Sequence, residues 1–516
     1  MEKSRLHYSI LNSSVTVVIQ VVNIFIKFLL QTVLIKELGA TFVGINGLFT
    51  NILTMLSFAE LGIGPAIVYS LYKPLAKKNE YEISALMKLF SKSYNFIGII
   101  IGVIGTILLP IIPWFVKNGS DIANLRIYFF LFVLNSALSY FFTYKRSLLI
   151  ADQKNYISAV NQFIFNLLQT VLQIGILFGL KNYLLFLIIQ VLCTFSSNVM
   201  ISFKVDKAYP FLKNFKNAKV NVETISTIKK NIVGMMGSKF GTVIIFGTDN
   251  LLISTFLGIV KVGIYSNYSL IVTAVTNVLT NAVNSVTSSI GNLTVSASSQ
   301  KVKSIFLRHL FINFLVTLFS SSLLLGLLNP FISFWIGKNY LLSSFTVEVI
   351  VINFALNQMR QTAVSFIGSY GLFWKVGIKS IIEAIVNLVL SLIFIYFLKL
   401  GIAGTILGSV MTNICINTWW EPRLVIKEGI KIPTPKYFTK YILYMFLIVV
   451  CSNLSRQVIL SLNGIPLIAQ IMIGILISIF VCTSCVLIIF FKSDDLMFFL
   501  QIIKKLILSK RENKNE

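Results

Sequence analysis

Fourteen apolar stretches run along this chain of 516 residues, and its basic residues gather in every second gap between them. Each stretch is near or above the length of about 20 residues that a helix needs to cross the hydrocarbon core of a bilayer. We therefore expect an all-α polytopic membrane protein with about 14 transmembrane helices. The predicted spans are residues 12–36, 43–72, 95–116, 127–144, 157–180, 182–203, 232–257, 264–290, 306–329, 344–365, 380–398, 402–422, 441–457 and 465–490.

The basic residues also predict the orientation of these spans. Of the 44 Lys and Arg residues, 34 fall on the side that holds both chain ends, and 8 fall on the opposite side. Cytoplasmic connections carry such an excess of basic residues. The sequence thus predicts a multi-pass protein of the cell (cytoplasmic) membrane with both termini in the cytoplasm. The connection at 117–126 is expected outside.

Composition excludes a soluble protein and disfavours nucleic acid as a partner. The mean hydropathy is +0.84, and only 12% of the residues are charged, which is far from a soluble domain of this length. The net charge of +26 is spread over short connections beside the spans. Basic residues in that position contact anionic lipid. We therefore expect the lipid bilayer, and no nucleic acid, as a partner.

The sequence gives no indication of an enzyme. It holds no GxxxxGK[ST] motif for ATP, it has two histidines, and its five cysteines all lie within apolar spans. The longest predicted outer connections, near 117–126 and 330–343, are too short for a catalytic domain. We therefore expect a transporter without catalytic residues, metal or cofactor.

The second half of the chain repeats features of the first. LGATFVGI begins at Leu38, and LGIVKVGI begins 219 residues later at Leu257. A weaker echo links residues 165–167 with 386–388. Six predicted spans separate the copies, so both have the same orientation, which predicts a parallel repeat about an axis along the membrane normal. The repeated glycines are expected to form tight turns where a side chain would crowd two helices. They are Gly39, Gly44, Gly258 and Gly263.

This repeat predicts two parallel six-helix lobes with two peripheral C-terminal helices. The predicted boundaries are 1–203 for the N-lobe, 204–231 for a cytoplasmic inter-lobe linker, 232–422 for the C-lobe, 441–490 for helices 13 and 14, and 492–516 for a cytoplasmic amphipathic tail. The tail alternates apolar residues with lysines, as interfacial helices do.

Polar residues form stripes on the leading helices of both predicted lobes. Steps of three and four residues place such residues on one face of a helix. The first span carries Gln20, Asn23, Lys27 and Gln31, and the eighth carries Asn277 and Asn281. One interpretation is hydrogen bonding between helices. Because the stripes occur in both lobes, we favour a hydrated central cavity that binds substrate.

Ionisable residues inside the apolar spans are further candidates, because such residues normally face an interior or a partner. Lys27 and Lys239 occupy the equivalent first and seventh spans, which suits the binding of an anion. Arg360 is a third candidate cation. The candidates for ion or proton coupling are Glu60, Asp249 and Glu383. The alternative is internal pairing of Lys27 with Glu60, of Lys239 with Asp249, and of Lys379 with Glu383.

These residues resemble a known family. The fourteen helices in a six-plus-six-plus-two plan, LGATFVGINGLF from Leu38 and FAELGIGPAIVYSLYK from Phe58 look like polysaccharide flippases. Ile382-Glu383-Ala384 with Asn387 is similar to the eleventh helix of that family. The resemblance places the chain in the multidrug/oligosaccharidyl-lipid/polysaccharide exporter superfamily.

The resemblance implies a flippase that moves undecaprenyl-pyrophosphate-linked oligosaccharide repeat units from the inner to the outer leaflet by alternating access, without ATP. Cavity cations would bind the pyrophosphate, and by matching helices these are Lys27 and Lys239. The relatives that flip the peptidoglycan precursor carry an arginine cluster in the first lobe, where this chain offers only Lys27. Implied partners are the polysaccharide polymerase and the chain-length machinery.

Two rival functions stay open at this point. A multidrug or cation exporter of the same superfamily would prefer a net acidic cavity, which the two lysines disfavour. A membrane-embedded polysaccharide polymerase or glycosyltransferase would need an outer catalytic loop, which the predicted spans do not provide.

Overall fold

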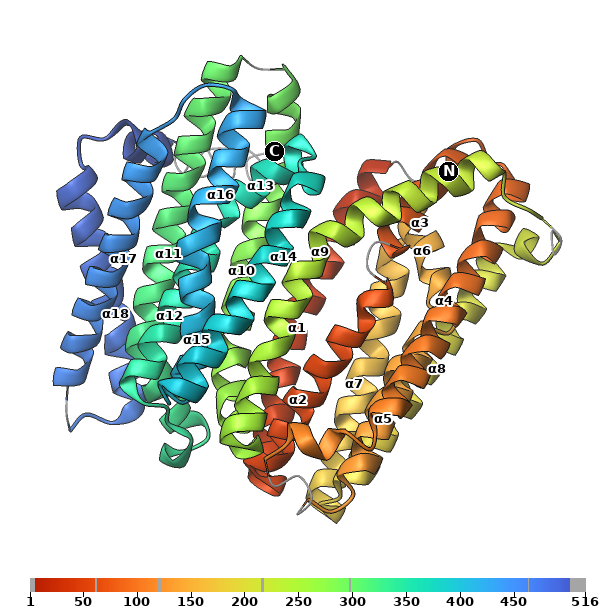
Figure 1. The fold of residues 1–516 in the computed structure, drawn as a ribbon, viewed down its shortest axis with the longest axis horizontal. Helices are drawn as coiled ribbons and strands as arrows, with labels where there is room; N and C mark the ends of the chain where they lie inside the picture. Colours follow the sequence, from red (N-terminus) through yellow and green to blue (C-terminus); the bar gives the residue numbers. More distant parts are fainter. Residues whose placement is uncertain are drawn as a thin grey trace, which may run out of the picture. The chain divides into compact units, whose positions relative to one another are not determined.

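The computed structural model describes residues 5–60, 63–117, 122–214, 218–296, 298–462 and 464–501, and within the helices it leaves out the side chains mainly of residues 5–11, 233–246 and 282–296. Throughout these ranges the chain forms helices and no β-strand (Figure 1). The predicted all-α fold is confirmed.

The chain divides into two compact units. Unit 1 comprises Met1–Asn267 and Phe373–Leu388, and unit 2 comprises Tyr268–Leu372 and Val389–Glu516. The predicted inter-lobe linker at 204–231 lies inside unit 1, so these units do not test the predicted lobe boundaries. The two-lobe division stays a prediction.

Unit 1 contains the first nine helices, the start of α10 and most of α14. Their bounds are α1 Arg5–Leu38, α2 Ala40–Leu56, α3 Ile63–Ala76, α4 Glu80–Leu108, α5 Leu125–Tyr140, α6 Tyr144–Ala151, α7 Asn155–Leu180, α8 Tyr183–Ala208, α9 Val222–Leu257, α10 Ile259–Ser296 and α14 Phe373–Leu392. One apolar core joins α3, α4, α6 and α8. Its central residues include Leu71, Leu86, Leu148 and Val205, each of which is fully buried.

The second predicted span, 43–72, is interrupted. Helix α2 ends at Leu56, and a 3₁₀ turn over Ser57–Glu60 precedes α3. Hydroxyl groups of Thr50, Thr54 and Ser57 donate hydrogen bonds to the backbone carbonyls four residues earlier, at 2.7, 2.8 and 2.9 Å. Such bonds bend a helix. These three hydroxyl groups lie along α2 up to the point where the helix ends.

The fourth predicted span, 127–144, also ends in a bend. Helices α5 and α6 differ in direction by 44°, and Phe142 between them has a φ of +67°. A positive φ is rare for a residue with a bulky side chain. This junction is fixed by polar contacts of α6 with α8, where Lys145 donates to Asp206 at 2.6 Å and Arg146 to Asn198 at 2.8 Å.

Unit 2 is built around α11, which packs against α12, α17 and α18 (Figure 1). The bounds of its helices are α11 Ser299–Trp335, α12 Ser344–Met359, α13 Gln361–Tyr370, α15 Ile402–Thr412, α16 Thr418–Leu424, α17 Lys436–Ser461 and α18 Leu467–Phe490. Aromatic rings fill the contact of α11 with α17. Phe314 stacks on Tyr444 at 4.3 Å between ring centres, and Phe306 stacks on Tyr437 at 4.9 Å.

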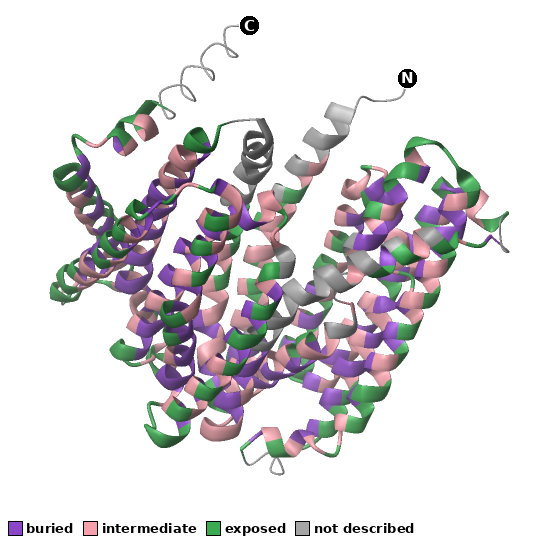
Figure 2. Ribbon diagram, turned by 45° about the horizontal axis from the view of Figure 1, so that its top comes forward, coloured by how far each residue is buried: buried purple, intermediate pink, exposed green. Residues whose placement is uncertain are grey.

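Nine helices within the described ranges are long and apolar enough to cross a membrane, or ten if α5 and α6 together form one bent span. They are residues 18–38, 80–108, 155–180, 183–208, 259–281, 299–335, 375–397, 436–461 and 467–490. Exposed residues run along whole helices rather than gathering at their ends (Figure 2). Many of these are large apolar residues, such as Phe25, Phe178, Phe397, Phe446 and Phe480. A multi-pass membrane protein is confirmed, and the total of fourteen spans stays a prediction.

Candidate functional site

Gly39 and Gly258 lie at two helix corners of unit 1, whereas Gly44 and Gly263 lie inside α2 and α10 and not in the turns that the sequence predicted. Gly39 has a φ of +85° between α1 and α2, and Gly258 has a φ of +98° between α9 and α10. A Cβ added to Gly44 would lie 2.1 Å from the Ile259 carbonyl oxygen, and one added to Gly263 would lie 2.0 Å from that of Ala40. The backbones of α2 and α10 therefore touch where neither helix has room for a side chain.

The polar face of α1 points toward the start of α10. Gln31 Nε2 donates to Asn267 Oδ1 at 2.9 Å, and the fully buried Asn267 donates onward to the Gly263 carbonyl at 3.0 Å. Lys27 lies one turn earlier on the same face. It is exposed, and no carboxylate of the described chain forms an ion pair with it.

The opposite face of α1 is apolar and exposed. At about 100° per residue, the residues on this face lie across the helix from the polar stripe that holds Gln20, Asn23 and Lys27. They are Val18, Val21, Phe25 and Leu29. This separation fits a helix with one face in lipid and the other in a polar interior. Both Gln20 and Asn23 are half-buried.

Glu60 lies at the break between α2 and α3. Its carboxylate accepts hydrogen bonds from the Tyr140 hydroxyl at 2.9 Å and from the Tyr94 hydroxyl at 3.5 Å. The predicted alternative, an ion pair with Lys27, is not among the ion pairs of the described residues. A carboxylate held by neutral donors at a helix break can exchange a proton or bind a cation.

Asp249 on α9 lies in a polar part of unit 1. Its Oδ1 atom is buried without a hydrogen-bond donor, and the same holds for Asn250 Oδ1, Ser254 Oγ and Ser266 Oγ. Asn250 donates weakly to the Gly47 carbonyl on α2 at 3.4 Å. Buried acceptors without donors are rare in folded proteins. The Asp249 carboxylate is thus a buried acceptor that no described residue satisfies at Oδ1.

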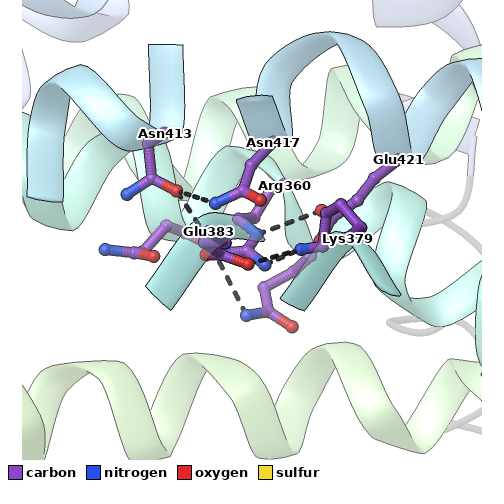
Figure 3. A network of polar contacts seen from close by, with 8 residues as sticks. Arg360, Lys379, Glu383, Asn413, Asn417 and Glu421 are labelled. Carbon is purple, nitrogen blue, oxygen red and sulfur yellow. Dashed lines mark hydrogen bonds and ion pairs between the residues drawn. The ribbon is translucent and has the colours of Figure 1, made fainter. Parts of the chain in front are cut away.

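Glu383 on α14 is paired. Lys379 Nζ donates to Glu383 Oε2 at 2.6 Å, and both side chains are almost completely buried (Figure 3). The i,i+4 spacing allows this pair within one helix. It is the arrangement that the sequence offered as the alternative to ion coupling.

Arg360 in unit 2 forms a bidentate ion pair with Glu421 (Figure 3). The two N–O distances are 3.0 and 2.6 Å, and a third nitrogen donates to Asn413 Oδ1 at 3.3 Å. Only 2% of the Glu421 side chain is exposed. All three guanidinium nitrogens of Arg360 thus donate hydrogen bonds within the protein. The main role of Arg360 in this structure is to join the α12–α13 junction to α16.

The remaining candidate residues are Lys239, Asn277 and Asn281. The side chain of Lys239 lies outside the described residues, although its backbone belongs to α9. Asn277 and Asn281 are exposed on the part of α10 that belongs to unit 2. Within the described residues, no group of three or more His, Cys, Asp or Glu side chains could hold a metal ion.

The sequence did not predict three sets of residues that contact the candidate residues. Asn267, Glu421 and the pair Tyr94 and Tyr140 all bind a predicted residue. Glu421 had a usable signal, because it is an acidic residue inside the predicted span 402–422. The tyrosines had none, because an aromatic residue in an apolar span predicts packing and not a hydrogen bond to one distant carboxylate.

The solved structures with similar folds are membrane transporters. The structure titled lipid II flippase MurJ, inward closed conformation, has a TM-score of 0.62 at 17% identity, and the match covers 92% of this chain and 99% of that one. An inward-facing multidrug resistance MATE transporter of the MOP superfamily gives 0.58 at 14% identity over 80% of this chain and 96% of its own. An outward-facing one gives 0.52 at 15% identity over 84% and 98%.

At these identities the likeness establishes the fold alone, which is that of a polytopic helical transporter as the sequence predicted. A comparison with curated proteins gives no match. The sequence itself matches a family over residues 9–288, more than half of the chain, and that family is described as polysaccharide biosynthesis protein. The chain therefore belongs to the polysaccharide biosynthesis protein family.

Proposed function

We propose that this protein moves undecaprenyl-pyrophosphate-linked oligosaccharide repeat units from the inner to the outer leaflet of the cytoplasmic membrane. The observation that carries the proposal is the combination of a polysaccharide biosynthesis sequence with the fold of a solved lipid flippase. A pathway that builds glycans on a lipid inside the cell needs a step that carries them across. A helical membrane protein without a catalytic set suits that step.

Alternating access is the proposed mechanism. The fold resembles one transporter described as inward-facing and one described as outward-facing, with TM-scores of 0.58 and 0.52. One topology is thus compatible with openings to either side. In this scheme the polyprenyl chain stays in lipid while the sugar and pyrophosphate cross through the polar interior.

Recognition of the pyrophosphate is assigned to Lys27 together with Lys239. Lys27 suits the role because it lies on the polar face of α1, is exposed, and has no carboxylate partner among the described residues. A cation that neutralised a neighbour would instead be expected in an ion pair, as Arg360 and Lys379 are. Gln20 and Asn23, on the same face of α1, would supply hydrogen bonds to sugars.

The driving force is assigned to the membrane potential and an ion gradient, because the chain carries no ATP motif. Outward movement of an anion is favoured by an inside-negative potential, by about 2.3 kcal/mol per charge per 100 mV. Glu60 and Asp249 are the proposed coupling groups, since each carboxylate lacks a basic partner among the described residues. Glu383 is the weaker candidate because it is paired with Lys379.

A multidrug exporter is the second candidate, and the resemblance to the MATE transporters favours it. Such a transporter carries amphipathic cations, which Lys27, without a carboxylate partner among the residues that the structure describes, would repel. The family match and this lysine therefore favour the lipid-linked substrate.

One assay separates the two candidates. The purified protein is reconstituted into liposomes containing a fluorescent undecaprenyl-pyrophosphate oligosaccharide, and a membrane-impermeant reductant bleaches the outer leaflet. We expect the reductant to bleach more than half of the labelled lipid only when the protein is present. Amphipathic cations should not slow this bleaching. Cation uptake by the same liposomes without movement of the labelled lipid would favour the exporter.

A further inference from the structure

A cavity of about 420 Å³ lies along one face of α16 and the turns on either side of it. Its lining includes Cys415, Trp419, Trp420, Arg423, Lys427 and Glu428. The proposed flippase mechanism uses none of these residues. Sites for small ligands typically have volumes of about 300–1,000 Å³, so the cavity is large enough for a phospholipid headgroup.

The rotation of α16 is fixed by its buried side. Glu421 is held there by Arg360, and Asn417 donates to Asn413 at 2.7 Å (Figure 3). At about 100° per residue, Arg423 points away from Glu421. Lys427 in the following π-helical segment is exposed, as Arg423 is, whereas Glu421 is buried. Trp419 is held in place by a stacked contact with Phe438, at 5.2 Å between ring centres. The buried ion pair thus presents the tryptophans and the two cations together.

The backbone of this segment is unusual on both sides of α16. Asn413–Asn417 and Val425–Ile430 are π-helical. A π-helical turn is rare and is found frequently at functional sites, because it changes which side chains share a face. Here the two π-helical segments flank the seven residues of α16 that carry both tryptophans and Arg423.

The lining has the chemistry of a membrane interface with an anionic ligand. Tryptophan is enriched where the hydrocarbon meets the headgroups, and Trp420 is 40% exposed. Arg423 and Lys427 are exposed and lie one helical turn apart. Arginine binds phosphate oxygens in pairs, and lysine adds a mobile charge. Glu428 is partly buried and already engaged by another group, so it opposes the two cations only in part.

We propose that this cavity binds the phosphate headgroup of an anionic phospholipid from the inner leaflet. The predicted span 402–422 ends at the cavity, and the connection that follows carries five basic residues on the predicted cytoplasmic side. Basic pockets at that depth bind anionic headgroups. A lipid rather than free phosphate is the occupant because the cations adjoin exposed indole rings at the end of an apolar span.

The test uses the full chain with Trp420 as its only tryptophan, the other four being replaced by phenylalanine. The protein is placed in vesicles of phosphatidylcholine that contain a fixed fraction of brominated phosphatidylglycerol or, separately, of brominated phosphatidylcholine. Bromine quenches tryptophan on contact. We expect the anionic lipid to quench Trp420 several-fold more strongly at equal fraction, and 10 mM inorganic phosphate to leave this preference unchanged.

Three double variants locate the effect. Arg423→Gln with Lys427→Gln should abolish the preference, whereas Lys431→Gln with Lys436→Gln removes the same charge from the same connection outside the cavity and should preserve it. Arg423→Lys with Lys427→Arg should retain most of it. Equal quenching by the two lipids in the parent protein would overturn the proposal. So would loss of the preference in the presence of phosphate, or an equal loss of the preference in the two glutamine double variants. Should the Trp420 protein not fold, phosphatidylglycerol retained per protein after detergent exchange replaces the fluorescence readout for the same variants.

Discussion

Gly44 on α2 and Gly263 on α10 make reciprocal contacts. A Cβ on Gly44 would reach the carbonyl oxygen of Ile259 at 2.1 Å, and a Cβ on Gly263 would reach that of Ala40 at 2.0 Å. Gly44 and Gly263 are 219 positions apart in the sequence, and so are Ala40 and Ile259. The two LGxxxVGI copies therefore pack against each other through equivalent atoms, as two related halves would.

Gly44→Ala and Gly263→Ala should each destabilise the protein, because the added methyl group meets a carbonyl oxygen of a packed helix. Overpacking of this kind costs about 1–3 kcal/mol, and we expect a lower thermal unfolding midpoint in detergent. The double variant should lose less than the sum, because one displacement of the helices relieves both clashes. Gly175→Ala on α7, where a Cβ would meet nothing within 4 Å, is the matched control. Wild-type unfolding of both single variants would show that this crossing is not tightly packed.

Arg360→Gln and Glu421→Gln should each lower the amount of folded protein. Removing one partner of a buried ion pair leaves an uncompensated charge, which costs about 3–5 kcal/mol. The double variant should recover a large part of the loss, because no charge then remains. Folded protein is measured by fluorescence-detected gel filtration. If Arg360 instead served mainly to bind substrate, Glu421→Gln would leave the amount of protein unchanged and Arg360→Gln would affect transport alone.

Glu60→Gln should leave the protein folded but remove the response of lipid movement to an imposed proton gradient. Glutamine retains an oxygen that accepts the hydrogen bond from Tyr140, but it cannot release a proton. The measurement compares labelled-lipid movement in liposomes with and without a pH difference. Tyr140→Phe serves as the control for the hydrogen bond alone and is expected to lower stability by about 1.5–3 kcal/mol. An unchanged gradient response in Glu60→Gln would remove Glu60 from the coupling mechanism.

Single cysteines should report the predicted orientation of the chain. In a background without the five native cysteines, Asn118→Cys should react with an impermeant maleimide added to whole cells, and Lys216→Cys only after permeabilisation. The basis is the excess of basic residues on one side of the predicted spans. Labelling of Lys216→Cys in intact cells would reverse the topology.

The helical fold was predictable because its signals are local. Long apolar stretches specify helices that need no partner to satisfy their backbone, and the positions of Gly39 and Gly258 mark corners that the structure shows with positive φ. The breaks inside predicted spans were less visible. Before the break after Leu56, the hydroxyl groups of Thr50, Thr54 and Ser57 bond to their own backbone, and an uninterrupted helix could carry the same residues.

The candidate residues and the one pair within a single helix, Lys379 with Glu383, could be predicted from the sequence, but the pairs between helices could not. Charges inside apolar spans pointed to Glu60, Arg360 and Glu383, and each is engaged in polar contacts. The partners of Glu60 and Arg360 come from helices far apart in the sequence, as with Arg360 and Glu421, which are 61 residues apart. Spacing along one helix cannot reveal such contacts, because they depend on how helices pack.

The most direct test of the central claim compares labelled-lipid movement by three proteins in matched liposomes. These are the parent chain, a Lys27→Ala, Lys239→Ala double variant, and a Lys338→Ala, Lys399→Ala double variant that removes the same charge from predicted outer connections. We expect the parent and the outer variant to expose the undecaprenyl-pyrophosphate oligosaccharide to the impermeant reductant. The Lys27→Ala, Lys239→Ala variant should fold and insert, but only the labelled lipid of the outer leaflet should then react with the reductant. Arginine at both positions should restore most of the lipid movement. Lipid movement at the parent rate by well-folded Lys27→Ala, Lys239→Ala protein would contradict the account.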